Sequence, residues 1–396
     1  MVITRSERLL DNMPVGALGI IPLSGCREIG SKVDSYLVSW RKEKAIQDSN
    51  DSSYFGYQKD SFIVEASTPR FGSGEAKGII EESVRGKDLY ILVDVLNYSI
   101  TYGMTGHTNH LSPDDHFQDL KRVIAAIGGK ARRLNVIMPF LYESRQHKRE
   151  GRESLDCAVA LQELVKLNVQ NIITFDAHDP RVQNAIPLSG FETITPLYQF
   201  IKELLAQVDD LKISADHMMA ISPDEGAARR AIDLANMLGL DMGMFYKRRD
   251  YTQIVDGRNP IVAHEFLGSN VEGKDVLIID DMISSGESML EVAAELKHRK
   301  AKRIFAMATF GLFTKGMGIF DEAYEKGLIN GIFTTNLIYQ SPELLKRDYY
   351  HSVDMSKYIA LIIDYLNHDG SLSDIMSPVA RLQEALDNYR AVHPDA

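Results

Sequence analysis

The apolar residues of this chain occur in short runs, each followed by a polar turn and then by a segment with helical spacing. These runs predict buried strands at Leu89–Val95, Asn135–Pro139, Asn171–Phe175, Met218–Ser222, Gly243–Tyr246, Val276–Ile279, Arg303–Thr309 and Gly331–Thr335. Amphipathic segments such as His116–Ile127 and Ser154–Leu167 separate the strands and predict helices. Strands that alternate with helices predict an α/β fold, in which parallel sheets are covered on both faces. The order of the segments suggests two similar halves.

Other segments have less regular patterns. Ser35–Trp40 predicts a strand, whereas Tyr98–Asp115 and Asp256–Val271 contain Gly, Asn and Pro residues that predict loops. The tail holds two helical stretches, Ser356–Leu366 and Pro378–Val392, separated by a Gly/Ser loop.

The stretch Val276–Ser288, VLIIDDMISSGES, combines a predicted strand with a polar loop and the start of a helix. Asp280 and Asp281 stand where the strand should end, and Ser284–Gly286 follows them. Backbone N–H groups and hydroxyls at a helix N-terminus can bind a phosphate, while paired carboxylates suit sugar hydroxyls or a divalent cation. An ordinary strand end, whose Asp and Ser residues cap the next helix, is an equally simple interpretation.

Other predicted strands also end in charged groups. Arg145–Arg152, RQHKREGR, follows one strand, and its guanidinium groups match the oxygens of a polyphosphate. His178 and Asp224 follow two further strands and suit a divalent cation or a phosphate, while Lys247 begins a basic segment. Taken alone, the basic run Arg145–Arg152 is more simply an exposed, solvated loop, and each of the other segments could be an ordinary turn or an exposed loop. Because parallel strands end at one edge of a sheet, their convergence favours a phosphate-handling site.

The composition narrows the possible functions. The chain of 396 residues is 44% hydrophobic, enough for two cores, and its formal net charge of -11 argues against nonspecific nucleic-acid binding. Cys26 and Cys157 form no CxxC motif, so we expect a reducing, cytoplasmic compartment. No apolar run is long enough to span a membrane, and no GxxxxGK[ST] motif occurs, so a bound ATP would not lie in a Walker loop.

Several segments resemble, in the same order, those of ribose-phosphate diphosphokinases, also called PRPP synthetases. They are RFGSGE, VRGKD, SRQHKR, DAHDPRVQN, SPDEGA, KRR, VLIIDDMISSGES and TTNLIYQ, and the resemblance extends from about Gly16 to Met376. It implies two tandem type I phosphoribosyltransferase-like domains, expected at 14–193 and 194–345, with C-terminal helices in 350–396 packing on the first. It also implies transfer of the β,γ-diphosphate of ATP to the C1 hydroxyl of ribose 5-phosphate, with Mg²⁺, in a homo-oligomer (a dimer or a hexamer).

The resemblance also implies a role for individual residues. The ribose 5-phosphate would be held by Asp280, Asp281, Ser284, Ser285, Gly286 and Ser288. ATP would lie against Arg145, Gln146 and His178, and its adenine against Phe71, Ser73 and Glu75. The catalytic cations would be Lys247 and Arg249, and the metal ligands would be His178 and Asp224.

Some positions depart from the family pattern. Ser73 and Ser284 stand where Asp is usual, Ala227 and Glu287 where Gly is usual, and Phe310 where His is usual. Glu287 would add an anion beside a phosphate site and weaken binding unless it points away. These departures leave open a catalytically silent regulatory subunit. A phosphoribosyltransferase that modifies a base is a third hypothesis, which the additional N-terminal half disfavours.

Overall fold

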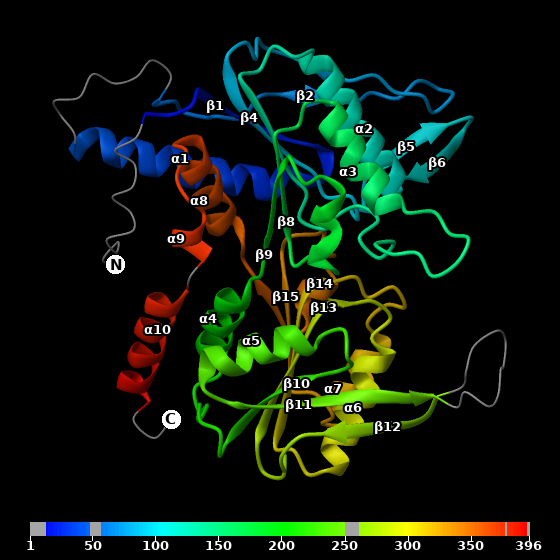
Figure 1. The fold of residues 1–396 in the computed structure, drawn as a ribbon, viewed down its shortest axis with the longest axis vertical. Helices are drawn as coiled ribbons and strands as arrows, with labels where there is room; N and C mark the ends of the chain where they lie inside the picture. The colour runs from blue at the N-terminus through cyan, green and yellow to red at the C-terminus, as the bar shows by residue number, and fades with distance from the viewer. Residues whose placement is uncertain (1–12, 48–56, 250–260, 377, 394–396) are drawn as a thin grey trace. The chain divides into compact units, whose positions relative to one another are not determined.

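The computed structural model describes residues 13–47, 57–249, 261–376 and 378–393, which belong to two compact units (Figure 1). The first unit comprises Met1–Thr195, Asn336–Tyr339 and Asp354–Ser377, and the second comprises Pro196–Thr335, Gln340–Val353 and Pro378–Ala396. Each unit contains a mainly parallel sheet with helices packed against it. The predicted α/β class is therefore confirmed. The predicted boundaries of the two domains, 14–193 and 194–345, stay a prediction.

The first unit is built on a five-stranded sheet in the order β1-β4-β7-β8-β9, in which every pairing is parallel. Its strands are β1 (Ala17–Pro22), β4 (Lys87–Leu92), β7 (Arg133–Ile137), β8 (Asn171–Phe175) and β9 (Gly190–Ile194), with short β2 (Ala66–Ser67), β3 (Ile79–Ile80), β5 (Thr101–Met104) and β6 (His107–His110) outside the sheet. Its helices are η2 (Ser24–Cys26), α1 (Arg27–Gln47), α2 (Pro113–Ile127), α3 (Asp156–Lys166), η3 (Pro180–Ala185), α8 (Ser356–Asn367) and α9 (Ser373–Met376).

Local signals explain where α2 begins and ends. Ser112 accepts a hydrogen bond from the backbone N–H of Asp115, whose side chain accepts one from the Ser112 N–H in return, and Pro113 occupies the first turn. Gly128 ends the helix in the left-handed conformation. The predicted helix at His116–Ile127 is confirmed and extended by one N-terminal turn.

A buried polar network ties α8 to α1, and the two helices lie side by side in Figure 1. The Arg41 side chain, 2% exposed, donates to Asn367 Oδ1 at 2.7 Å and to Asp364 Oδ1 at 3.1 Å. Asn367 in turn donates to Asp88 Oδ2 of β4 at 2.8 Å. Because a buried guanidinium is costly without such partners, this network specifies where α8 packs.

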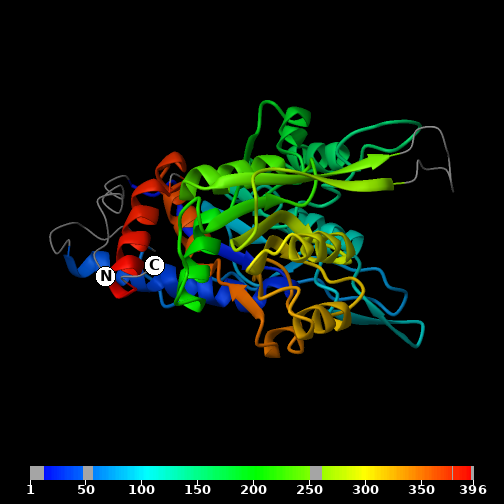
Figure 2. The same cartoon turned by 90° about the horizontal axis from the view of Figure 1, so that it is seen from below.

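The second unit is built on a seven-stranded sheet in the order β12-β11-β10-β13-β14-β15-β16. Its strands are β10 (Met218–Ser222), β11 (Asp241–Arg249), β12 (Ile261–Leu267), β13 (Asp275–Ile283), β14 (Arg303–Gly311), β15 (Gly331–Thr335) and β16 (Tyr350–Val353), and only the β11–β12 pairing is antiparallel. Its helices are α4 (Leu197–Gln207), α5 (Ala228–Leu238), α6 (Glu287–His298), α7 (Gly318–Glu325), η4 (Leu344–Lys346) and α10 (Val379–Val392). Figure 2 shows β11 and β12 side by side as a long ribbon.

Three predictions from the hydrophobic pattern were wrong. Ser35–Trp40 lies within α1, where Val33 and Leu37 are buried one helical turn apart, so the short apolar run marks a helix face. Tyr98–Asp115 contains the hairpin of β5 and β6. Asp256–Val271 contains β12, and the part of this segment before residue 261 lies outside the described residues. The β5–β6 hairpin has no fully buried residue, and β12 is an edge strand of its sheet, beside β11. Periodicity detects such strands poorly.

The tail was also predicted incorrectly in part. Helix α10 packs against α4 of the second unit, whereas the prediction placed the whole of 350–396 on the first half. The Tyr389 hydroxyl donates to the Val208 carbonyl at 2.7 Å and accepts from the Leu211 N–H at 2.9 Å. The guanidinium of Arg381 lies 5.2 Å from the centre of the Tyr198 ring. The residues in these contacts are far apart in the sequence, so no local sequence pattern predicts that α10 packs on α4.

Among the helices in the described ranges, none combines the length and the apolar character needed to cross a lipid bilayer.

Candidate functional site

The carboxyl ends of β10 and β13 form the centre of the candidate site in the second unit. The chain passes from β10 outward to β11 on one side, and from β13 to β14, β15 and β16 on the other side. The strand order therefore reverses between β10 and β13, and open α/β sheets bind ligands in the crevice at such a point. Asp224 follows β10, and Asp280 and Asp281 lie near the end of β13.

Strand β13 is longer than its apolar run predicted. It continues through both aspartates to Ile283, because Asp280 pairs with Ala308 and Met282 with Phe310 on β14. The Asp281 side chain is 4% exposed, and its backbone N–H donates to Asp280 Oδ1 at 2.8 Å. The pair is therefore held by a sheet, which positions side chains more rigidly than a loop would.

The carboxylates at this point repel one another. Burial is the main cause that raises the pKa of Asp280, and the negative charges of Asp281 and Asp224 raise it further. Asp224 itself is oriented by a turn in which its Oδ1 accepts from the N–H groups of Gly226 at 2.9 Å and Ala227 at 3.2 Å. Hydroxyl donors or a cation would stabilise the negative charge of these crowded carboxylates, as the sequence predicted.

The loop after β13 turns directly into α6. Gly286 is the N-cap residue and has a φ of 89°, and a Cβ at this position would collide with the ring of Phe320. Only glycine therefore fits at this turn. The loop presents the hydroxyl-bearing residues Ser284, Ser285 and Ser288 around the N-terminus of a helix of 12 residues, where backbone N–H groups favour an anion.

Glu287 does not remain an isolated anion beside this loop. Its Oε1 lies 2.6 Å from Nζ of Lys315, and Ser285 Oγ donates to its Oε2 at 3.3 Å. The lysine is the main cause that lowers the pKa of Glu287. Lys315 was missed by the sequence reasoning because it lies 28 residues further along the chain, in the loop after β14. No motif marks it.

The predicted catalytic cations Lys247 and Arg249 lie on β11, which continues beyond the predicted strand end at Tyr246. Their backbones pair with His264 and Ile261 of β12, with an irregularity in the register between Arg248 and Arg249. The segment is therefore the distal part of a β-ribbon, whereas the sequence predicted the root of a loop. The residues at 250–260, within the predicted loop, lie outside the described part.

In the first unit, the predicted adenine-binding residues form one tight turn, Phe71–Glu75, which we call the nucleotide segment. The Phe71 N–H donates to the Glu75 carbonyl at 2.7 Å, and the Gly74 N–H donates to the Phe71 carbonyl at 2.9 Å. Ser73 Oγ donates to Glu75 Oε2 at 2.8 Å, and the Phe71 side chain is 52% exposed. An exposed ring on a projecting turn is suited to stacking against a base.

The other predicted ATP-binding residues follow the adjacent strands β7 and β8. Gln146 Nε2 donates to the Ser154 carbonyl at 2.8 Å, which closes the basic loop that carries the exposed Arg145. The rings of His147 and His178 lie 5.4 Å apart, so the structure brings these two loops together. His178 is exposed, while neighbouring Asp179 is occupied by Arg181, which lowers its pKa to about 2.

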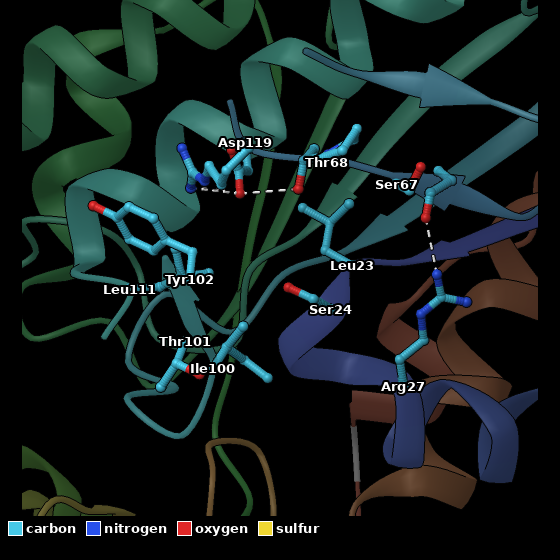
Figure 3. Close-up of a pocket in the computed structure, with 13 residues that line it drawn as sticks. Leu23, Ser24, Arg27, Ser67, Thr68, Ile100, Thr101, Tyr102, Leu111 and Asp119 are labelled. Carbon is cyan, nitrogen blue, oxygen red and sulfur yellow. Dashed lines mark hydrogen bonds and ion pairs between the residues drawn. The ribbon is translucent and has the colours of Figure 1, made fainter. Parts of the chain in front are cut away.

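A separate pocket of about 290 Å³ lies in the first unit (Figure 3). It is lined by residues at the start of α1, by Ser67–Arg70, and by the base of the β5–β6 hairpin. The predicted ATP-binding side chains of the described chain are not among its lining residues. Within the described ranges, no three His, Cys, Asp or Glu side chains are arranged to hold a metal ion by themselves.

Known proteins match both halves of the chain. A model of the N-terminal domain of ribose phosphate pyrophosphokinase matches residues 18–167, and a model of the phosphoribosyl transferase domain matches residues 189–345. The ribose-phosphate pyrophosphokinase of Mycoplasma genitalium is 29% identical over 275 residues, which are 68% of this chain and 74% of that protein. That of Vibrio parahaemolyticus is 26% identical over 313 residues, 78% of this chain and 90% of that protein.

A solved structure shares the fold. The phosphoribosylpyrophosphate synthetase from Mycobacterium smegmatis superposes with a TM-score of 0.68 at 19% identity, over 89% of this chain and 99% of that one. The two family models match successive parts of the chain, in the same order as the two mainly parallel sheets. With its two phosphoribosyltransferase-like halves and its aspartate pair before a glycine-capped helix, this chain belongs to the ribose-phosphate pyrophosphokinase (PRPP synthetase) family.

Proposed function

We propose that this chain is a ribose-phosphate diphosphokinase, which transfers the β,γ-diphosphoryl group of ATP to the C1 hydroxyl of ribose 5-phosphate and releases PRPP and AMP. The observation that carries this proposal is the site at the strand-order reversal of the second unit, where Asp280 and Asp281 precede the loop Ser284–Gly286 at the start of α6. The first unit also matches the N-terminal domain of ribose phosphate pyrophosphokinase, and a simple phosphoribosyltransferase would not need this additional half.

On the sugar side, each group has a distinct role. The carboxylates of Asp280 and Asp281 would accept hydrogen bonds from the ribose hydroxyls. The N–H groups at the start of α6, with the hydroxyls of Ser284, Ser285 and Ser288, would bind the 5-phosphate. The raised pKa of Asp280 supports this assignment, because a carboxyl crowded by other carboxyls gains most from new donors.

On the nucleotide side, the nucleotide segment Phe71–Glu75 would hold the adenine, and Arg145, Gln146 and His178 would hold the polyphosphate. Lys247 and Arg249 would neutralise the negative charge that develops during transfer. Phosphoryl transfer asks for little covalent chemistry from a protein, so positioning and charge neutralisation would supply most of the rate.

A magnesium ion fits the residues present. Mg²⁺ usually keeps several waters and binds one or two carboxylates together with substrate phosphates, so it does not need a cluster of three protein ligands. Asp224 suits this role because its Oδ1 is oriented by two backbone N–H groups beside the crowded Asp280. We propose Asp224 and His178 as ligands. Magnesium held there would supply positive charge close to the substrate phosphates.

The direct test is to incubate the pure chain with ATP, Mg²⁺ and ribose 5-phosphate over a range of phosphate concentrations. AMP and PRPP should form in equal amounts, and omission of ribose 5-phosphate should abolish both. Asp281→Ala should raise the Michaelis constant for ribose 5-phosphate more than that for ATP, while the exposed Asp233→Ala on α5 serves as the matched control. Absence of AMP formation under all conditions would overturn the proposal.

A silent regulatory subunit is the second candidate, and the departures from the family pattern favour it. Phe310 is 2% exposed within β14 and replaces a usual polar side chain by a core residue. The Glu287–Lys315 ion pair weakens the case, because the lysine offsets the additional anion. The two candidates are separated by turnover of the isolated chain. We further propose that the chain is cytoplasmic and forms a homo-oligomer. Light scattering would give the molar mass and so distinguish a dimer from a hexamer.

A further inference from the structure

The hairpin formed by β5 and β6 contacts the nucleotide segment at its turn. The backbone N–H of Thr105 donates to the Gly72 carbonyl at 3.1 Å. Gly74 has a φ of 93°, and a Cβ at this position would lie 2.5 Å from Sδ of Met104. The hairpin turn therefore packs closely against the nucleotide segment: a side chain added at position 74 would have to displace Met104 and adopt a φ that L-residues disfavour.

A second contact joins the base of the hairpin to the residue just before the nucleotide segment. The Arg70 guanidinium lies 4.9 Å from the centre of the Tyr102 ring, within the range of a cation–π interaction. Its Nη2 also lies 2.9 Å from Asp119 Oδ2 and 3.6 Å from Asp115 Oδ1, both on α2. Figure 3 shows Tyr102 and Asp119 on the wall of the same pocket. Arg70, 9% exposed, is thus held between α2 and the hairpin.

The hairpin contributes little to the core of the unit. Every residue from Thr101 to His110 is exposed or only partly buried, and an isolated two-stranded hairpin is marginally stable in water. Its ends meet, since the Leu111 N–H donates to the Ile100 carbonyl at 2.9 Å. The hairpin is therefore an excursion that returns to its starting point, and its contacts with Arg70, Gly72 and Gly74 are the ones that connect it to a predicted binding element.

We propose that the β5–β6 hairpin positions the nucleotide segment for the adenine base of the diphosphoryl donor, with Tyr102, Met104 and Thr105 as positioning residues. This inference rests on the proposed function, because it takes ATP as the ligand of the segment. A projecting turn loses conformational freedom when it binds a base, and a support that orders it beforehand reduces that loss. The effect should appear in nucleotide binding and should leave ribose 5-phosphate binding unchanged.

The decisive variant replaces Thr101–His110 by two glycines, because Ile100 and Leu111 are already adjacent. Amide hydrogen exchange should become faster in residues 71–77, and the dissociation constant for ATP, measured by calorimetry, should rise about tenfold or more, since binding geometry depends steeply on position. Tyr102→Ala should raise it about threefold by loss of the cation–π contact. Tyr102→Phe keeps the ring and should restore normal binding. The exposed His107→Ala is the matched control within the hairpin.

The outcomes separate the two levels of the proposal. Normal ATP affinity and unchanged exchange in residues 71–77 of the excised variant would overturn the inference and leave the proposed function intact. Equal loss of affinity for ATP and ribose 5-phosphate would also overturn it, because the hairpin would then be a general structural element. If the excised variant does not fold, the comparison of Tyr102→Ala with Tyr102→Phe decides. A wild-type chain that binds no ATP would overturn the proposed function and this inference together.

Discussion

Replacement of Gly286 by alanine tests whether the glycine-capped start of α6 forms the phosphate site. Gly286 has a φ of 89°, and the added Cβ would meet the ring of Phe320, a fully buried side chain of α7. Two effects therefore combine in Gly286→Ala. A left-handed conformation costs an L-residue about 1–2 kcal/mol, and overpacking a core typically costs about 1–3 kcal/mol. The sum is a loss of about 2–5 kcal/mol in the free energy of unfolding.

A matched control separates these two effects. Gly327 also has a positive φ, of 68°, but among the described residues no atom lies within 4 Å of an added Cβ. Gly327→Ala should therefore show the conformational cost alone. The difference between the two variants isolates the collision with Phe320. A double variant, Gly286→Ala with Phe320→Leu, should recover part of the difference because the smaller side chain makes room.

Two measurements follow from this reasoning. Urea unfolding monitored by circular dichroism should give a lower midpoint for Gly286→Ala than for Gly327→Ala. In the coupled assay, Gly286→Ala should also raise the Michaelis constant for ribose 5-phosphate about tenfold or more, since the displaced helix N-terminus no longer directs its N–H groups at the phosphate. If Gly286→Ala matched Gly327→Ala in both measurements, the proposed phosphate loop would be refuted.

Three further predictions concern charge. Lys247→Ala should lower turnover about 100-fold or more with nearly unchanged ATP binding, and an equal loss of nucleotide affinity would make the lysine a ground-state binder instead. Burial raises the pKa of Asp94 to about 7. The folded chain therefore binds this proton more tightly than the unfolded chain, and the free energy of unfolding should fall as the pH rises from about 4 toward that value. Asp94→Asn should flatten this slope in urea titrations, and an unchanged slope would exclude Asp94 as its source. Glu287→Gln should leave the urea midpoint unchanged, because its exposed ion pair with Lys315 adds little stability, yet it should lower the Michaelis constant for ribose 5-phosphate at low salt. A raised constant would show that Glu287 assists binding.

Much of the fold was accessible from the pattern of the chain. Strands β8, β10 and β15 begin and end where the apolar runs predicted, because each is almost entirely buried and most of its residues are apolar or glycine. Strand β13 was predicted too short, because Asp280 and Asp281 interrupt the apolar run while the backbone continues to pair with β14. Polar residues within a strand are read as its end unless the neighbouring strand is known.

The sequence predicted the candidate site only in part, because it does not show which strands are neighbours. The positions of Asp224 after β10, of Asp280 near the end of β13 and of Gly286 before α6 follow from local sequence, since a strand, a turn and a helix are made by neighbouring residues. That the charge of Asp224 acts on Asp280 depends on β10 lying beside β13. The facing residues Ala220 and Leu277 are 57 positions apart, and α5, β11 and β12 lie between them in the chain. No periodicity reports that adjacency.

By itself, the sequence determined the alternation of strands and helices, the order of the family segments, and the charged groups at the strand ends. Tertiary structure alone decided that Lys315 neutralises Glu287, that α10 packs on α4, and that the β5–β6 hairpin supports the nucleotide segment. The physical reason is the range of the interactions involved. Helix and strand patterns arise between residues a few positions apart, whereas ion pairs and packing contacts join residues that only the folded chain brings together.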